Sequence, residues 1–308
     1  VLYNGDCFIN KRGNLMWVVL ALLSAVLSAI YYLSAQNIKL DANTFMVYRG
    51  WIVALLLLPL LAFNPVIFSN AFYIMAICQG LIAAVVDYAV FGINKKYGSE
   101  TVSSITPLSV IIVFVLWCFI DVGLLKRYWQ NPWQSGAIFM ACAGAVLALN
   151  RYHQVAFTRQ ALYKLLPLLL LTSAFTVLSK MVMNQTTSTP FWGALWQSFI
   201  IAAVVATVHM VIYCKKKLPL KNLVLAHKLL KGLVFVYMIG FLGMKSLALY
   251  YAQNPAYVAV LAYTSMFWVM LLSRGVKAFK FNNSDEQAAA KWKILFLISV
   301  LVLILATK

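Results

Sequence analysis

Long apolar runs follow one another along the whole chain, separated by short polar connections. Each run has about 20 residues, the length that a helix needs to cross the hydrocarbon core of a membrane. A span surrounded by lipid must satisfy its own backbone hydrogen bonds, so we expect every run to be helical. We predict ten spans, at residues 15–35, 44–63, 70–93, 101–121, 132–150, 161–183, 190–213, 229–251, 255–273 and 288–307.

The segment 240–272 holds two apolar runs that are separated only by Gln253-Asn254-Pro255. Proline suits the first turn of a helix, and asparagine suits the N-cap position before it. We therefore predict that one helix ends just before Asn254 and that another begins at Pro255. Lys245 lies inside the first of these runs. A lysine at membrane depth is costly, which makes it a candidate functional residue.

Composition indicates a membrane protein with no room for a soluble domain. Of the 308 residues, 64% are hydrophobic and 10% are charged, whereas a soluble domain carries about 25% charged residues. The run at 15–33 is too long for the apolar part of a signal peptide, so we interpret it as the first span. We expect an integral multi-pass protein of the cell membrane, inner or plasma.

The excess of basic residues bears on orientation rather than on nucleic-acid binding, which we do not expect. The net charge is +18, and such an excess normally lies in the cytoplasmic loops of a membrane protein. The odd-numbered connections, together with the adjoining ends of the predicted spans, carry 17 basic residues, whereas the chain ends and the even-numbered connections carry 5: Lys11, Arg12, Lys126, Arg127 and Lys308. The positive-inside rule then predicts cytoplasmic odd connections and two external termini.

The two halves of the chain contain local matches in the same order, which indicates an internal repeat. VYRGWIVALLLL, from residue 47, matches LWQSFIIAAVVA, from residue 195, and places Arg49 on Gln197. The segment that starts at Asp87 aligns without gaps with the segment that starts at Lys245. An odd number of spans in each half gives the halves opposite orientations, as in many secondary transporters.

The sequence therefore predicts an all-α membrane protein with ten transmembrane helices in two inverted five-helix repeats, at residues 1–150 and 151–308. Several features carry a resemblance to a known family: the region of Arg49, Thr106-Pro107-Leu108, the span at 131–149, and Asn254-Pro255-Ala256-Tyr257-Val258. On these residues the chain resembles the drug/metabolite transporter superfamily, in its EamA-like branch. The resemblance covers nearly the whole chain. It implies that two EamA-like repeats move a small metabolite by alternating access.

Asp87 and Lys245 are the charged residues that lie deepest in the predicted spans. Neither side chain can easily reach an interface, so each needs a partner or a water-filled cavity. Because they occupy matching repeat positions, we expect them to pair near the twofold axis. They form either a structural ion pair or part of a cavity. Arg49, nearer the end of its span, is either an interfacial anchor or a third member of that cavity.

The predicted site is a central cavity lined by spans two, three, seven and eight. Its substrate-binding residues are expected to be Lys245, Asp87, Arg49, Gln197 and Tyr263. Two cations against one carboxylate favour a substrate with a carboxylate or phosphate group, such as an amino acid, an organic acid or a phosphorylated metabolite. Protonation of Asp87 would free Lys245, so a proton is the expected coupling ion.

Other polar and aromatic residues in the spans have more ordinary interpretations. Lys164 and Lys180 are expected to snorkel to an interface, and His209 is expected to be interfacial rather than part of a proton relay. The aromatic residues either pack in the bundle or line the cavity: Tyr88, Tyr237, Tyr250, Tyr263 and Trp268.

No catalytic, cofactor or metal site is predicted. The five cysteines and three histidines are scattered without ligand spacing, and the chain has no glycine-rich phosphate loop. Secondary active transport is therefore the leading interpretation. A non-transporting scaffold or sensor subunit, and a membrane-embedded enzyme acting on lipid, are the alternatives.

Overall fold

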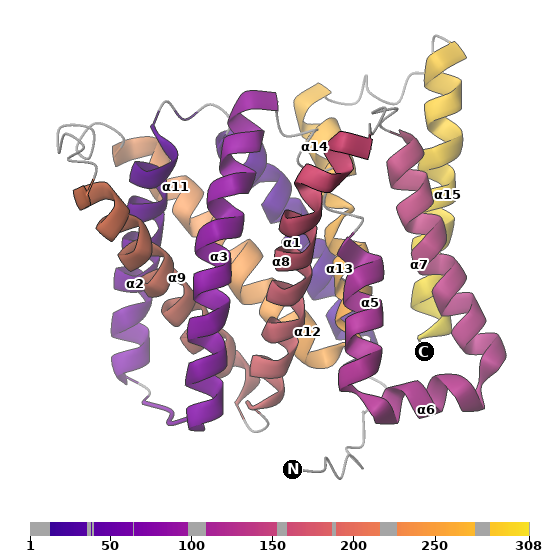
Figure 1. Ribbon diagram of the computed structural model, residues 1–308, viewed down its shortest axis with the longest axis horizontal. Helices are drawn as coiled ribbons and strands as arrows, with labels where there is room; N and C mark the ends of the chain where they lie inside the picture. The colour runs from indigo at the N-terminus through magenta and orange to yellow at the C-terminus, as the bar shows by residue number, and fades with distance from the viewer. Residues whose placement is uncertain are drawn as a thin grey trace.

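The described part of the chain is all-helical. The computed structural model describes residues 13–35, 38, 40–63, 65–97, 109–152, 159–186, 189–215, 227–274 and 284–307. Its elements, shown in Figure 1, are α1 (Gly13–Ala35), α2 (Ala42–Phe63), α3 (Asn70–Tyr97), α5 (Ser109–Ile120), α6 (Val122–Gln130), α7 (Pro132–Tyr152), α8 (Arg159–Asn184), α9 (Pro190–Lys215), α11 (His227–Tyr237), the π-helix η2 (Met238–Met244), α12 (Lys245–Tyr251), α13 (Pro255–Ala262), α14 (Ser265–Arg274) and α15 (Ser284–Ala306).

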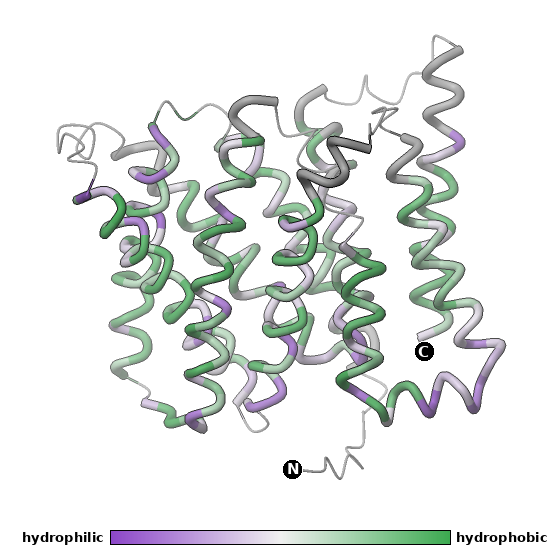
Figure 2. Tube along the Cα trace, viewed as in Figure 1, coloured by the Kyte–Doolittle hydropathy of each residue, from purple (hydrophilic) through white to green (hydrophobic). Residues whose placement is uncertain are grey.

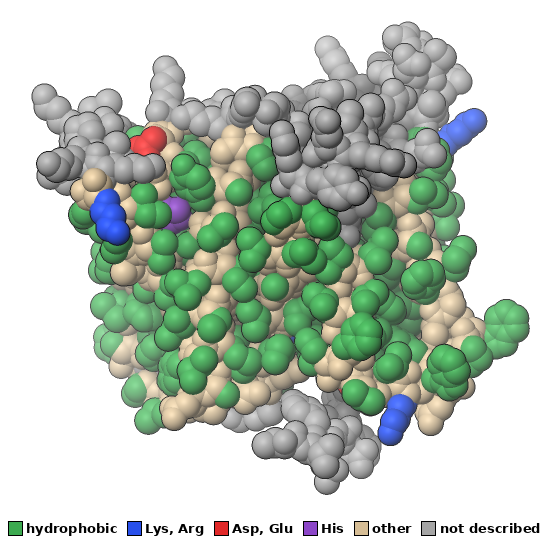
Figure 3. Space-filling model, in the orientation of Figure 1, with side chains coloured by type: hydrophobic (Ala, Val, Ile, Leu, Met, Phe, Trp, Pro, Cys, Tyr) green, Lys and Arg blue, Asp and Glu red, His purple; other side chains and the backbone are tan. Residues whose placement is uncertain are grey.

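Among the described residues, six helical stretches are long and apolar enough to cross a membrane. They are α1, α2, α3, α8, α9 and the stretch Gly232–Tyr251, which α11, η2 and α12 form together. α5 and α6 count as a seventh only if they are taken as one span, although they meet at a bend of 101°. Hydrophobic residues dominate the helices and much of the visible surface (Figures 2 and 3). The chain is an integral multi-pass membrane protein.

Each of the ten predicted ranges overlaps a helix or consecutive helices in the described residues, which confirms the all-helical prediction. Three of these segments contain only shorter apolar stretches, at Pro132–Ala148, Pro255–Val269 and Ile294–Ala306. A crossing by all ten therefore stays a prediction. Residues 101–108 of the fourth predicted span lie outside the described part, as do Thr106-Pro107-Leu108 and most of the basic connections on which the orientation depends.

The hinge between α12 and α13 has the predicted form. α12 ends at Tyr251, and α13 begins at Pro255, which stands in its first turn. The side chain of Asn254 accepts a hydrogen bond from the backbone N–H of Ala256 at 2.9 Å, as an N-cap should. The prediction from Asn254-Pro255 is confirmed.

Two spans near this hinge depart from continuous α-helix, which the sequence analysis did not predict. Residues 238–244 wind as a π-helix before α12. The ninth span breaks at Tyr263-Thr264, between α13 and α14. Both departures fall on the helices that carry Lys245 and Tyr263, and irregular turns inside membrane helices often accompany functional sites.

Helices that are far apart in the sequence pack as neighbours. α2 packs against α9, α7 packs against α15, and α3 packs against both α8 and α9. α1 packs against η2, α12, α13 and α14. In Figure 1, the α7–α15 pair stands at one end of the molecule and the α2–α9 pair at the other.

A glycine allows the close approach of α2 and α9. A Cβ atom added to Gly50 would lie 2.6 Å from the carbonyl oxygen of Ala202 and 2.7 Å from the Cβ of Ala206. Small residues at such contacts let helix backbones approach closely in membranes. Because the clashing atoms are backbone or Cβ atoms, they cannot move without shifting a helix.

Gly50→Ala is therefore expected to destabilise the protein by about 1–3 kcal/mol through overpacking. Gly92→Ala is the matched control, because a Cβ at Gly92 on α3 would meet nothing within 4 Å. The melting temperatures of the two purified variants in one detergent test this. Equal melting temperatures would contradict the packing assigned to Gly50.

Candidate functional site

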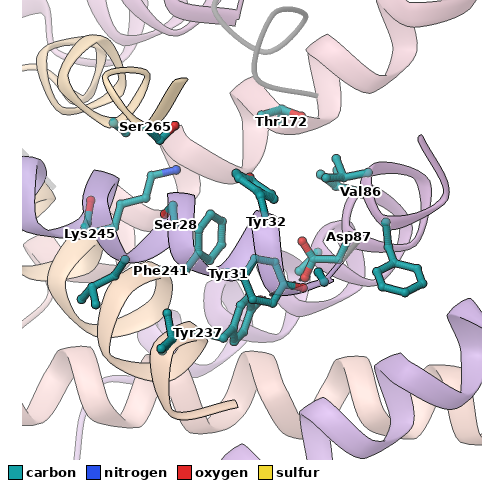
Figure 4. Close-up of a pocket in the computed structure, with 18 of the residues that line it drawn as sticks. Ser28, Tyr31, Tyr32, Val86, Asp87, Thr172, Tyr237, Phe241, Lys245 and Ser265 are labelled. Carbon is teal, nitrogen blue, oxygen red and sulfur yellow. Dashed lines mark hydrogen bonds between the residues drawn. The ribbon is translucent and has the colours of Figure 1, made fainter. Parts of the chain in front are cut away.

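A cavity lies among α1, α2, α3, α8, α11, η2, α12, α13 and α14 (Figure 4). The centres of water-sized molecules can occupy about 90 Å³ of this cavity. That is room for several waters, at roughly 10–15 Å³ each. Its charged residues are Arg49, Asp87 and Lys245. Its aromatic residues are Tyr31, Tyr32, Phe91, Phe175, Tyr237, Phe241 and Tyr263, and its hydroxyl-bearing residues also include Ser24, Ser28, Thr172 and Ser265.

Arg49 and Asp87 form an ion pair in this cavity. The Arg49 Nη2 atom lies 2.6 Å from Asp87 Oδ2, and Arg49 is 2% exposed. Arg49 Nη1 donates to the Tyr31 hydroxyl at 3.2 Å, and the Tyr237 hydroxyl donates to Asp87 Oδ2 at 3.1 Å. The guanidinium also lies over the Tyr237 ring, 4.1 Å from its centre. Two tyrosines therefore hold the pair in place, one from α1 and one from α11.

One donor of Arg49 remains unused. Its Nε atom is buried and has no hydrogen-bond partner among the described residues. An unpaired buried donor costs about 1–3 kcal/mol. The guanidinium therefore has one buried N–H group without an acceptor among the described residues.

Lys245 occupies a different part of the cavity. Among the described residues it has no ion pair and no hydrogen bond, and its Nζ atom contacts the rings of Phe241 and Phe175 at 4.9 and 5.8 Å from their centres. In the view of Figure 4, its amine lies near Ser28 and Ser265. Ring faces attract the ammonium group but are not strong hydrogen-bond acceptors. The N–H donors of Lys245 therefore remain available for a stronger acceptor.

The expected pairing of Asp87 with Lys245 is therefore wrong. The repeat argument assumed that equivalent residues meet, but Asp87 reaches Arg49 of the neighbouring helix α2 instead. In Figure 4, Ser28, Tyr31 and Tyr32 of α1 lie between Asp87 and Lys245. The forked guanidinium also suits a carboxylate in this largely buried position better than an ammonium does.

The π-helix positions Lys245 and one wall of the cavity. Lys245 is the first residue after η2, and Phe241 of η2 lies under its amine. Gly240 lets η2 approach α1, because a Cβ there would lie only 2.5 Å from the Cβ of Leu27. The wide π turn and this close contact together direct α12 toward the cavity.

Gln197 does not line the cavity, in contrast to its predicted role. Its Nε2 atom donates to Gln79 Oε1 at 2.7 Å, and Gln79 in turn donates to the Ser179 hydroxyl. This buried polar cluster joins α3, α8 and α9. Buried amides need partners, and Gln197 finds its partner in another amide rather than in Arg49 or a substrate.

The walls of the cavity also differ from the prediction. α9, the seventh predicted span, contributes no residue to the described lining, and α2 contributes only Arg49. α1 contributes more residues than any other helix, and it was not expected there. The sequence held a signal for it, since Ser24, Ser28, Tyr31, Tyr32 and Ala35 recur at the three- and four-residue spacing of one helix face.

The expected aromatic residues divide into two groups. Tyr237 and Tyr263 line the cavity, and the Tyr263 hydroxyl lies 2.5 Å from that of Ser109 on α5. Tyr88 is 40% exposed and stacks on His209 instead. Tyr250 and Trp268 are not among the lining residues.

Two residues expected at an interface are buried. Lys180 is 6% exposed, and its Nζ donates to the Tyr250 carbonyl at 3.0 Å, near the C-terminal end of α12. His209 is 3% exposed, with its ring nitrogens 3.1 Å from Asn43 Oδ1 and 3.0 Å from the Ala84 carbonyl. Backbone and amide oxygens lie within hydrogen-bonding distance of these two side chains, so neither side chain has to reach water at an interface. The side chain of Lys164 lies outside the described part.

No three His, Cys, Asp or Glu side chains within the described ranges lie together as metal ligands would. The site thus consists of an ion pair, a separate amine, hydroxyl groups and aromatic walls. Comparison with protein-family models finds none that matches the chain, and no curated protein matches it either.

Proposed function

We propose that this protein is a secondary active transporter that moves a small anionic or zwitterionic metabolite across the cell membrane. The observation that carries this proposal is Lys245, an amine in the cavity that contacts two ring faces and forms no ion pair or hydrogen bond with the described residues. Arg49, Asp87 and Lys245 together leave one positive charge in the cavity. A carboxylate or phosphate on the substrate would balance this charge.

Two inverted repeats, residues 1–150 and 151–308, are part of the proposal. Exchanging the halves pairs α1 with α8, α2 with α9, α3 with α11–α12, α5 with α13–α14, and α7 with α15. Under this exchange the contacts α2–α9 and α7–α15 map onto themselves, while α3–α8 maps onto α12–α1 and α5–α8 maps onto α13–α1. A bundle without this symmetry would have no reason to repeat its contacts, and inverted repeats are typical of secondary transporters.

Ten spans and alternating access complete the proposal. The short helices α13 and α14 would form one broken span, and the break lies beside the cavity residue Tyr263. Broken helices at a central site give transporters a place where one part can rock against another.

We also propose a proton as the coupling ion, with a different partner from the one expected from the sequence. Neutralising Asp87 would weaken its bond to Arg49. The guanidinium, still held by Tyr31 and the Tyr237 ring, would then be free to share the substrate's anionic group with Lys245.

Uptake by the purified protein in liposomes tests the function. With an imposed pH gradient, we expect saturable uptake from a panel of radiolabelled amino acids, organic acids and sugar phosphates, and none of equally small organic cations. Empty liposomes and the Lys245→Met variant are the controls. Uptake of the cations alone, or no uptake and no binding of any compound by folded protein, would contradict the proposal.

A further inference from the structure

The helix α6 is unlike the other elements because it lies across the ends of its neighbours. It turns away from α5 by 101° and joins α5 to α7 at the edge of the molecule (Figure 1). Asp121 stops the preceding helix and caps the new one, since its Oδ1 atom accepts from the Leu124 N–H at 2.9 Å. The turn is thus encoded locally.

The inner face of α6 is fixed against the protein. Leu124 is 1% exposed, and Tyr128, one turn later, places its hydroxyl 2.5 Å from that of Tyr257 on α13. The Asn254 side chain donates to the same hydroxyl at 3.4 Å. These contacts determine which residues of α6 face outward.

The outward part of α6 divides into an apolar edge and a basic edge. Val122, Leu125 and Trp129 follow a three- and four-residue spacing and are 55%, 42% and 87% exposed. The exposed side chains of Lys126 and Arg127 lie beyond that apolar edge on the helix surface.

We propose that α6 is an interfacial helix that binds anionic phospholipid headgroups. The bilayer must cover the exposed apolar side of α5, and the apolar edge of α6 continues that surface through Phe119, which is 76% exposed. Tryptophan concentrates at the headgroup level of membranes. A helix with an apolar edge and an adjacent basic edge lies in the interface and is attracted to anionic lipid. This proposal does not depend on the transport proposal.

Depth-dependent quenching tests the location. The label is a fluorophore on Trp129→Cys, in a full-length chain whose five native cysteines are replaced by alanine. The vesicles contain phosphatidylcholine with nitroxide quenchers near the headgroup or deep in the acyl chains. We expect stronger quenching by the shallow nitroxide. A label on Val115→Cys, on the apolar side of α5 and 45% exposed, should show the reverse order.

Energy transfer to headgroup-labelled lipid tests the charge preference. Vesicles containing labelled phosphatidylglycerol should give more transfer than vesicles with labelled phosphatidylcholine. The preference should fall about fivefold for each basic residue replaced in Lys126→Gln and Arg127→Gln. Lys215→Gln, an exposed residue at the end of α9, should leave it unchanged.

Three results would overturn the proposal. Strong quenching of the position 129 label by aqueous iodide, with none by lipid nitroxides, would place α6 in water. Stronger quenching by the deep nitroxide would place it inside the membrane core. Equal transfer to both headgroups would show that the basic edge does not select anionic lipid.

Discussion

Replacing Lys245 by methionine is expected to weaken the binding and uptake of anionic substrates strongly while the protein stays at least as stable as the wild type. The amine has ring contacts but no acidic partner among the described residues. Its partial burial costs free energy that no ion pair offsets. Methionine has a similar length and no charge, so it removes this cost. Function and stability should therefore change in different directions.

The loss of binding should be large. A hydrogen bond to a charged group contributes about 1.5–3 kcal/mol, which corresponds to roughly 10- to 150-fold in affinity. The measurements are the apparent affinity for uptake in liposomes and the melting temperature in detergent.

Lys180→Met is the matched control, since it removes a buried lysine that lies outside the cavity. Lys180 donates to the Tyr250 carbonyl, so this variant should lower the melting temperature by removing that buried hydrogen bond and leave substrate affinity unchanged. If Lys245→Met transported anions at the wild-type rate, or if both variants lost affinity equally, Lys245 would not be the substrate's partner.

The features of the fold that follow from local chemistry could be predicted from the sequence. Long apolar runs gave the helices, and Asn254-Pro255 gave the cap and start of α13. The turn into α6 also had a local cause, the cap at Asp121. It was missed because residues 122–130 are too few and too polar to be recognised as part of a span.

The sequence partly predicted which residues line the site, but it did not predict which of them form the ion pair. Charge at membrane depth correctly brought Asp87, Lys245 and Arg49 into one cavity. Which cation meets the carboxylate depends on helix neighbours: Asp87 of α3 reaches Arg49 of α2, and side chains of α1 appear between Asp87 and Lys245 in the view of Figure 4. No one-dimensional pattern contains that arrangement. Gln197 shows the same limit, because a repeat match does not say which way a side chain points.

The second large effect concerns the ion pair between Arg49 and Asp87. Asp87→Leu should destabilise the protein by about 3–5 kcal/mol, since it leaves the guanidinium buried without a carboxylate. Unfolding free energies in one detergent system provide the measurement. Tyr237→Phe is the control for the lost hydroxyl contact, because it removes only the bond to Asp87 and keeps the ring under Arg49. It should cost only about 1 kcal/mol.

Removing both charges should restore most of the lost stability. In Arg49→Met with Asp87→Leu, neither position of the pair keeps a charge, and apolar side chains of similar size replace a buried pair at little cost. The double variant should therefore be more stable than Asp87→Leu alone, although neither should transport if Arg49 and Asp87 serve the coupling step. If the double variant lost as much unfolding free energy as the two single variants lose together, the two residues would act independently. The 2.6 Å contact between them would then contribute nothing to the stability of the fold.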